Sequence, residues 1–222
     1  MSIPDIHDPE VFREHISRGS LPLRELEVSS REGDVPIIGP HIASFLHLLV
    51  KMLNARRILE LGTANGYSTI WLAMALEELE KREQKGGDGD HSSSKGRRSI
   101  LTVEWDQDMI EEALRNIEFV GYSRFVDQRQ GDARKVVEEL DDDSFDLVFI
   151  DVEKEYYSEL LESGIRVLRP GGLLFFDNTA FVTAGDFLNQ ISGHPDIDPF
   201  HFYGFMPDHG PEWDAVTLAV KK

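Results

Sequence analysis

The chain has 222 residues, a length that suits one large domain at about 150 residues per domain. Its 41% hydrophobic and 29% charged residues are close to globular averages, so a core can form and wholesale disorder is excluded. A net charge of −18 argues against nucleic acid as a partner, since nucleic-acid binders carry basic surfaces, and the lack of cysteine excludes disulfides, thiolate metal sites and cysteine nucleophiles.

Residues 1–55 are predicted to form a helical preface. Asp8 and Pro9 suit the start of a helix, and a second short helix is expected near Ser20. Residues 41–53 are apolar on nearly all sides, which is typical of a buried helix. The opening residues lack the layout of a signal peptide, and no run has the ~18 apolar residues of a membrane span. We therefore expect a soluble, cytoplasmic protein with no membrane partner.

From residue 56 to 222, short apolar strands alternate with helical segments. The predicted strands cover residues 57–61, 100–104, 125–129, 145–150, 173–177, 200–205 and 215–220. A helix is expected from Tyr67 to about Glu83, and apolar faces at helical spacing mark two more helices, at residues 109–117 and 156–165. This alternation predicts one α/β domain.

Residues 80–99 interrupt the pattern, because none of these twenty positions carries an aliphatic or aromatic side chain. We predict a flexible surface insertion here. Its Asp88, Asp90 and His91 resemble a metal-ligand set, but a solvated loop is the stronger interpretation.

The segment LELGTANGYST, residues 59–69, places Gly62 and Gly66 at a strand-to-helix turn. Glycine there permits positive φ and a close approach of the backbone to a ligand, and the following helix offers free N–H groups to an anionic group. The turn lacks both the dinucleotide fingerprint and the P-loop lysine, and a purely structural turn is an alternative. Glu104 ends the next strand, where an acid can accept both hydroxyls of a ribose. Together, the turn and the acid predict a nucleoside site.

Two neighbouring segments fit the base of that nucleoside. Trp105 is placed to pack on an adenine face, although an ordinary surface aromatic is an alternative. Gly131, Asp132 and Ala133 follow the third strand and are expected beside the same base.

Acidic residues end two further apolar strands, because Asp151 follows DLVFI and Asp177 with Asn178 follows LLFF. If these strands are neighbours, their tips lie ~5 Å apart, and two carboxylates and an amide oxygen converge at the ligand-binding edge of the sheet. Like charges at that distance need a cation, and an all-oxygen set favours Mg²⁺, Mn²⁺ or Ca²⁺ over zinc. Lys154 is expected to face the same cleft, although alone it would be interpreted as a surface lysine.

Together these motifs resemble the cation-dependent O-methyltransferases, the family of catechol and caffeoyl-coenzyme A O-methyltransferases. The resemblance covers residues 38–222 and is strongest in LELGTANGYSTIWLA, TVEWD, GDA, FDLVFIDVEKEYY and RPGGLLFFDN. It implies a Rossmann-like, seven-stranded sheet, mostly parallel with one antiparallel strand, with S-adenosylmethionine as the methyl donor. It also implies a homodimer.

The resemblance assigns roles to individual residues of this chain. Cofactor contacts are expected for Glu60, Gly62, Gly66, Tyr67, Ser68, Glu104, Trp105, Asp132, Ala133 and Asp151. Asp151, Asp177 and Asn178 match the metal ligands of the family, and Lys154 matches its proposed general base.

The sequence departs from the family at three places. Asp-Val-Glu-Lys at 151–154 stands where relatives usually have Asp-Ala-Asp-Lys, the insertion after Leu79 is unusual, and the segment TAFVTAGDFLNQ after Asn178 is shorter than in many relatives. The acceptor pocket therefore does not follow from the family, and Glu212 is only a weak candidate for contacting a substrate hydroxyl.

We predict a divalent-cation-dependent enzyme that moves the sulfonium methyl of S-adenosylmethionine to an oxygen of a small, catechol-like acceptor. A phenol has a pKa of about 10, so it needs a metal and Lys154 to become a good nucleophile at neutral pH. Lys154 acts either as a neutral base or as a charged group that stabilises the oxyanion. Metal-independent methylation of oxygen or nitrogen and a nucleoside-binding module without turnover are the alternatives, and the missing fingerprint argues against a nicotinamide dehydrogenase.

Overall fold

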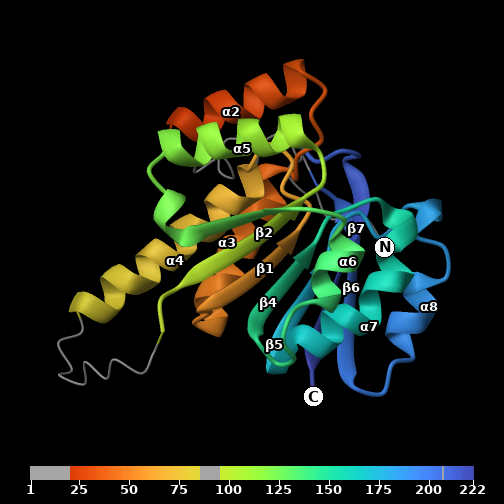
Figure 1. The fold of residues 1–222 in the computed structure, drawn as a ribbon. Helices are drawn as coiled ribbons and strands as arrows, with labels where there is room; N and C mark the ends of the chain where they lie inside the picture. Colours follow the sequence, from red (N-terminus) through yellow and green to blue (C-terminus); the bar gives the residue numbers. More distant parts are fainter. Residues whose placement is uncertain (1–20, 86–95, 207) are drawn as a thin grey trace, which may run out of the picture.

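A seven-stranded sheet forms the centre of the computed structural model, which describes residues 21–85, 96–206 and 208–222 (Figure 1). Its strands are β1 (Arg57–Leu61), β2 (Ser99–Glu104), β3 (Val126–Gln130), β4 (Phe145–Ile150), β5 (Leu168–Phe176), β6 (Ile197–Phe205) and β7 (Trp213–Lys221). They are ordered β3-β2-β1-β4-β5-β7-β6, and β7 alone runs antiparallel to the other six strands. The predicted Rossmann-like, mostly parallel sheet with one antiparallel strand is confirmed.

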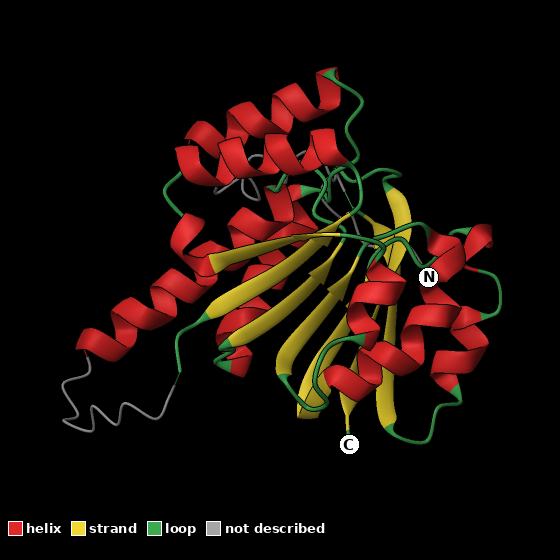
Figure 2. Ribbon diagram, in the orientation of Figure 1, coloured by secondary structure: helices red, strands yellow, loops and turns green. Residues whose placement is uncertain are grey.

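Helices cover both faces of the sheet (Figure 2). One face carries α2 (Leu21–Glu32), α3 (Pro40–Leu53), α4 (Tyr67–Lys85) and α5 (Gln107–Phe119). The other carries α6 (Ala133–Glu138), α7 (Tyr157–Val167) and α8 (Phe187–Ser192). Successive residues of a strand point to opposite faces, so Ile58 of β1 joins the first hydrophobic core and Leu59 the second. The central parallel strands are therefore buried on both sides.

The order of the strands reverses between β1 and β4, and these two strands stand next to each other at the centre of the sheet. Their carboxyl ends are held together by a hydrogen bond of 2.9 Å from the Asp151 amide to the Leu61 carbonyl. Gly62 continues from β1 with φ of +99°, a conformation that favours glycine. Ligands of open α/β sheets bind at such a reversal, at the carboxyl ends of the strands.

The N-terminal prediction is tested only in part. The helix expected at Asp8 and Pro9 lies outside the described residues. The described part of the preface has two helices: α2 begins at Leu21, next to the expected start near Ser20, and α3 begins at Pro40, one residue before the predicted range.

The described residues of the predicted insertion, 80–99, are loop only at 96–98, because residues 80–85 are helical and Ser99 belongs to β2. Helix α4 continues to Lys85, and Arg98 is buried just before β2. The Arg98 guanidinium donates to the Asn54 carbonyl (3.2 Å), to Asn54 Oδ1 (2.8 Å) and to Glu83 Oε1 (2.8 Å). The remainder of the segment, residues 86–95, lies outside the described residues.

Within the described ranges, none of the helices combines the length and the apolar character that crossing a membrane requires.

Candidate active site

A cavity of about 980 Å³ opens at the carboxyl ends of the central parallel strands. Its floor is formed by the residues at the ends of β1, β2, β4 and β5, and its walls include the α2–α3 linker (residues 33–39) and the described part of the β6–β7 loop (residues 206 and 208–212). Of the predicted site residues, these line it: Gly62, Tyr67, Ser68, Glu104, Trp105, Asp132, Ala133, Asp151, Lys154, Asp177 and Asn178. The structure thus brings together all the predicted residues except Glu60 and Gly66.

Glu104 lies at the end of β2, where its carboxylate holds the glycine turn. One oxygen accepts hydrogen bonds from the amides of Thr63 (3.2 Å) and Ala64 (2.9 Å). The other accepts from the amides of Trp105 (2.9 Å) and Asp106 (3.1 Å). The predicted position of Glu104 is therefore correct, but its carboxylate also has a structural task that sequence analysis did not foresee. Ribose hydroxyls would share these oxygens with the backbone.

Glu60 does not reach the cavity, which corrects the prediction of a cofactor contact. Its side chain is completely buried beneath the glycine turn and accepts hydrogen bonds from the hydroxyls of Ser68 (2.6 Å), Thr69 (2.5 Å) and Thr102 (2.6 Å). Burial raises the pKa of Glu60 to about 7, although the three hydroxyls work in the opposite direction. Glu60 therefore supports the turn from below, on the face of β1 that α4 covers.

Gly66 also supports the turn rather than lining the cavity. Its φ is +87°, and a Cβ at this position would lie 3.3 Å from Ala113 of α5. Tyr67 begins α4 and lines the cavity, and its hydroxyl donates to the buried Glu27 of α2. Asn65 Nδ2 bonds to Ser30 Oγ at 2.7 Å, so two polar contacts fix α2 on the turn.

Asp132 and Trp105 mark the end of the cavity where a base was predicted. Asp132 is the N-cap of α6 and accepts a hydrogen bond from the Arg134 amide, while the Arg134 guanidinium contacts both of its oxygens at 3.0 and 2.8 Å. Arg134 also lies over the Tyr156 ring, 3.9 Å from its centroid. Trp105 is 65% exposed at the rim of the cavity. A flat group entering here would meet Trp105 and the Arg134–Tyr156 pair.

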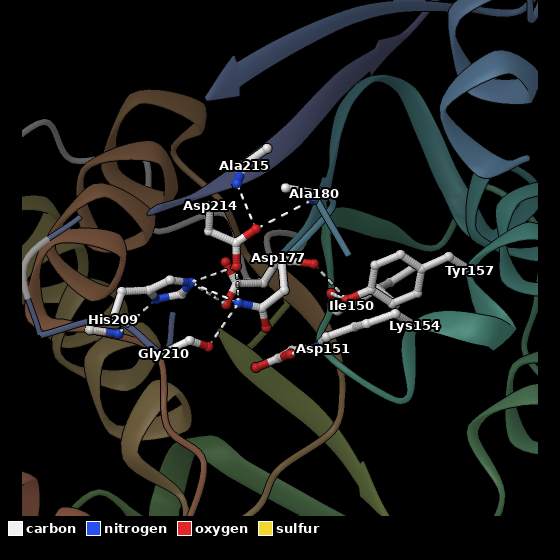
Figure 3. Close-up of polar contacts among 12 residues, drawn as sticks. Ile150, Asp151, Lys154, Tyr157, Asp177, Ala180, His209, Gly210, Asp214 and Ala215 are labelled. Carbon is white, nitrogen blue, oxygen red and sulfur yellow. Dashed lines mark hydrogen bonds and ion pairs between the residues drawn. The ribbon is translucent and has the colours of Figure 1, made fainter. Parts of the chain in front are cut away.

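The acidic pair lies at the tips of neighbouring strands, as predicted. Ile150 of β4 is in register with Phe176 of β5, so Asp151 and Asp177 follow at the same edge (Figure 3). Lys154 Nζ stands 2.6 Å from Asp151 Oδ1 and 5.5 Å from the centre of the Tyr157 ring. The Tyr157 hydroxyl donates to the backbone carbonyl of Asp177 at 2.6 Å, which anchors the end of β5.

Asp177 is the most unusual group of the site. Its side chain is only 1% exposed, and neither carboxylate oxygen has a hydrogen-bond partner. Burial raises the pKa of Asp177 to about 7; His209 and Lys154 act against this shift, and the charges of Asp151 and Asp214 act with it. A buried carboxylate without partners normally requires a cation or a proton to balance it.

Asn178 has a left-handed backbone, with φ of 48°, and its amide nitrogen is bonded away from the acidic pair. Nδ2 donates to Asp214 Oδ2 at 2.6 Å and to the Gly210 carbonyl at 3.4 Å. The His209 ring is buried beside it, with Nε2 at 2.8 Å from Asn178 Nδ2. Sequence analysis missed both His209 and Asp214. The signal that could have found them is the antiparallel last strand, whose start must lie at the edge where parallel strands end.

The donor set fits a hard cation, with two carboxylates and an amide oxygen as its members. Throughout the described ranges, histidine, cysteine, aspartate and glutamate side chains nowhere form a group of three or more that could hold a metal ion. The predicted cation site contains only two residues of these types, Asp151 and Asp177, because its third ligand is Asn178. The observation that supports it is the buried Asp177, whose carboxylate has no hydrogen-bond partner. Glu212 also lines the cavity, where its Oε1 accepts from the Asp208 amide at 3.3 Å.

The chain matches two families by sequence. A family described as a methyltransferase domain matches residues 59–179, and one described as O-methyltransferase matches residues 20–86. A catechol O-methyltransferase of Niastella koreensis is 32% identical over 197 residues, which cover 86% of this chain and 80% of that protein. The catechol O-methyltransferase of Mycobacterium tuberculosis is 30% identical, with 95% and 82% covered. A caffeoyl-CoA O-methyltransferase of Zea mays is 32% identical, with 61% of this chain and 46% of the maize protein covered.

Solved structures with the same fold include two with a bound cofactor or product. TomG of Streptomyces achromogenes, an O-methyltransferase in complex with S-adenosylmethionine, superposes with a TM-score of 0.77 at 26% identity, covering 96% of this chain and 95% of TomG. An O-methyltransferase of Bacillus cereus in complex with S-adenosylhomocysteine gives a TM-score of 0.78, with 96% of each chain covered. Its identity is 24%, so this second likeness concerns the fold alone.

Proposed function

The chain belongs to the family of catechol and caffeoyl-CoA O-methyltransferases and is an S-adenosylmethionine-dependent O-methyltransferase. We propose that it methylates a small, catechol-like acceptor with the help of a divalent cation. The observation that carries the cation is Asp177, a buried carboxylate without a hydrogen-bond partner beside Asp151 and Asn178. Catechol is favoured because its two adjacent oxygens can complete the coordination of one hard cation.

The residues that would hold the cation are Asp151, Asp177 and Asn178. When bound there, Mg²⁺ or Mn²⁺ acts as a Lewis acid that favours the ionised form of an acceptor hydroxyl. The chain itself supplies the geometry, because the glycine turn and Glu104 would hold the donor on one side while the α2–α3 linker and the β6–β7 loop enclose the rest of the cavity. Such positioning of the two reactants can contribute a large part of the rate enhancement.

The reaction breaks the sulfur–methyl bond of S-adenosylmethionine and forms an oxygen–methyl bond on the acceptor. The electron pair of the broken bond stays on sulfur, which gives S-adenosylhomocysteine, and one proton leaves the acceptor hydroxyl. Lys154 lines the cavity next to Asp151, and we assign it either the removal of this proton or the stabilisation of the oxyanion that remains.

A metal-independent reaction is the second candidate, and one contact favours it. Lys154 Nζ stands 2.6 Å from Asp151 Oδ1, so an ammonium group already balances one of the two carboxylates. In that case Lys154 alone would stabilise the ionised acceptor, and no hard cation would be needed.

Methylation of a catechol panel with labelled donor, after treatment with EDTA and again after addition of Mg²⁺ or Mn²⁺, separates the two candidates. Loss of activity with EDTA and recovery with the metal supports the cation. Full activity after EDTA on every acceptor that is methylated favours Lys154 alone. Monophenols in the same panel test the requirement for two adjacent oxygens. The homodimer stays a prediction that light scattering of the purified chain would test.

A further inference from the structure

The His209 ring connects two parts of the cavity that are far apart in the sequence. Its Nδ1 accepts a hydrogen bond of 3.2 Å from the amide of Gly39, at the end of the α2–α3 linker. Its Nε2 lies 2.8 Å from Asn178 Nδ2 and 3.6 Å from one carboxylate oxygen each of Asp177 and Asp214 (Figure 3). The ring is therefore a bridge between a wall of the cavity and the acidic end of β5.

The direction of the hydrogen bonds follows from the fixed donor. A backbone amide can only donate, so Gly39 requires His209 Nδ1 to be an acceptor. In the neutral ring the proton then sits on Nε2, which is 3.6 Å from a carboxylate oxygen of Asp177 and of Asp214 and is attracted by both. The 2.8 Å contact between Nε2 and Asn178 Nδ2 joins two donors, so it is not a hydrogen bond. The two ring nitrogens thus have different tasks.

Asp214 fixes the orientation of Asn178 next to this ring. A carboxylate oxygen at 2.6 Å must face the NH₂ end of the amide, because an amide oxygen at that position would be repelled. The carbonyl oxygen of Asn178 is consequently turned away from Asp214. That oxygen is the ligand that the proposed cation would use.

Gly39 shows how closely the linker is fitted to the loop that carries His209. A Cβ at Gly39 would lie 2.8 Å from the His209 amide nitrogen and 2.9 Å from the Asp208 carbonyl. Just before the linker, Arg31 in the last turn of α2 forms an ion pair of 3.0 Å with Asp208 of the same loop. Residues 35–38 of this linker line the cavity, so any displacement from His209 changes one of its walls.

We infer that His209 is a positioning residue for methyl transfer, which holds the α2–α3 linker through Nδ1 and, through the attraction between Nε2–H and the carboxylate, Asp177 at the end of β5. This inference rests on the proposed function, since it assigns the linker to substrate binding and the end of β5 to the chemical step. Loss of the Nδ1 contact therefore affects substrate binding, and loss of the Nε2 contact affects the alignment of the cation ligands.

Two substitutions separate these tasks in the full-length chain. His209→Asn places an amide oxygen near the position of Nδ1 and removes the group at Nε2, whereas His209→Gln places an amide near Nε2 and removes the acceptor for Gly39. We expect His209→Asn to lower kcat and weaken Mn²⁺ binding by about 10-fold or more, the usual effect of losing a group that supports a metal ligand, with the acceptor KM nearly unchanged. We expect His209→Gln to raise the acceptor KM with kcat nearly unchanged.

Mn²⁺ binding is measured by titration calorimetry, which does not depend on turnover. His201→Asn and His201→Gln serve as matched controls, because His201 is exposed on β6 and bonds to Ser192 and Thr217 outside the cavity. Wild-type kinetics in both His209 variants would overturn the inference. The inference would also be overturned if both variants showed the same decrease in kcat, the same increase in KM and the same decrease in melting temperature. That result would show that the ring serves only the stability of the fold. If the wild type proves metal-independent, the proposed cation fails, while the division between kcat and KM still tests His209.

Discussion

Gly62 and Asp151 approach each other so closely that a Cβ at Gly62 would stand 2.0 Å from the Asp151 carbonyl oxygen. The contact lies where β1 and β4 end, and it joins the glycine turn to the strand that carries the first acidic residue of the site. The positive φ of +99° at Gly62 is part of the same arrangement. Both atoms within 3 Å of this Cβ, the carbonyl oxygen and the carbonyl carbon of Asp151, belong to the backbone. The backbone itself would therefore have to move to admit a methyl group.

Gly62→Ala should lower the free energy of unfolding by about 2–4 kcal/mol, which combines an unfavourable φ with a backbone clash. Urea denaturation measures this loss. Gly121→Ala is the matched control, because Gly121 also has a positive φ, +82°, but its Cβ would meet nothing within 4 Å. The control should lose only about 1 kcal/mol from backbone strain. Equal losses in both variants would show that the contact with Asp151 is unimportant.

Glu60→Gln should change the pH dependence of stability. The pKa of Glu60 is raised by burial from 4.5 to about 7, so the folded chain binds this proton more tightly than the unfolded chain. The resulting stabilisation is fully present below pH 4.5 and is lost as pH rises through 7. The amide of the variant stays neutral throughout, so its unfolding free energy relative to wild type should increase between pH 4.5 and 8, by at most about 3 kcal/mol.

Chemical denaturation at each pH gives this difference directly. Glu111→Gln provides the control, because Glu111 is exposed on α5 and its difference from wild type should be flat. A flat difference for Glu60→Gln would contradict an ionisable carboxyl that is penalised by burial.

The acidic pair was predictable because its signal is local. Asp151 and Asp177 each follow a continuous apolar strand, and neighbouring parallel strands end at the same edge. His209 and Asp214 carry no such local signal, because their place depends on how the antiparallel β7 returns after β6. Pairing of β7 between β5 and β6 brings Asp214 beside Asn178, a contact across 36 positions of sequence.

Glu60 and Arg98 show a different limit of sequence analysis. Both are charged residues beside turns or loops, and both are buried by contacts that no local pattern contains. Glu60 lies on the face of β1 that α4 covers, where three hydroxyls donate hydrogen bonds to its carboxylate. The Arg98 guanidinium donates hydrogen bonds to two backbone carbonyls just after α3 and to Glu83 of α4. Tertiary hydrogen bonds decide the burial of such groups, so a polar segment does not by itself indicate a loop.

Glu104→Ala should weaken binding of S-adenosylmethionine by about 1–3 kcal/mol, the cost of leaving buried hydrogen-bonding groups without partners. The variant removes the acceptor of two amides in the glycine turn, Thr63 and Ala64, and of two amides just before α5, Trp105 and Asp106. It also removes the acceptor predicted for the ribose hydroxyls. Titration calorimetry measures the donor Kd. Glu111→Ala removes an exposed carboxylate of α5 and should leave that Kd unchanged. Unchanged affinity in a folded Glu104→Ala variant would remove this residue from the donor site.

Lys154→Met should reduce turnover far more than donor binding. The ammonium group lies 2.6 Å from Asp151 Oδ1 in the cavity, so its removal affects the charge of the site at the moment when the acceptor loses its proton. A general base is worth about 10²–10⁴-fold in kcat, and the loss should be smaller for acceptors of lower pKa. Lys154→Arg keeps the charge but cannot accept a proton, so it restores activity only if Lys154 acts by stabilising the oxyanion. Stopped assays from pH 6 to 9 with a series of substituted catechols give both comparisons. If Lys154→Met retains a kcat near that of the wild type over this whole range, Lys154 has no part in the chemical step and deprotonation falls to the cation alone.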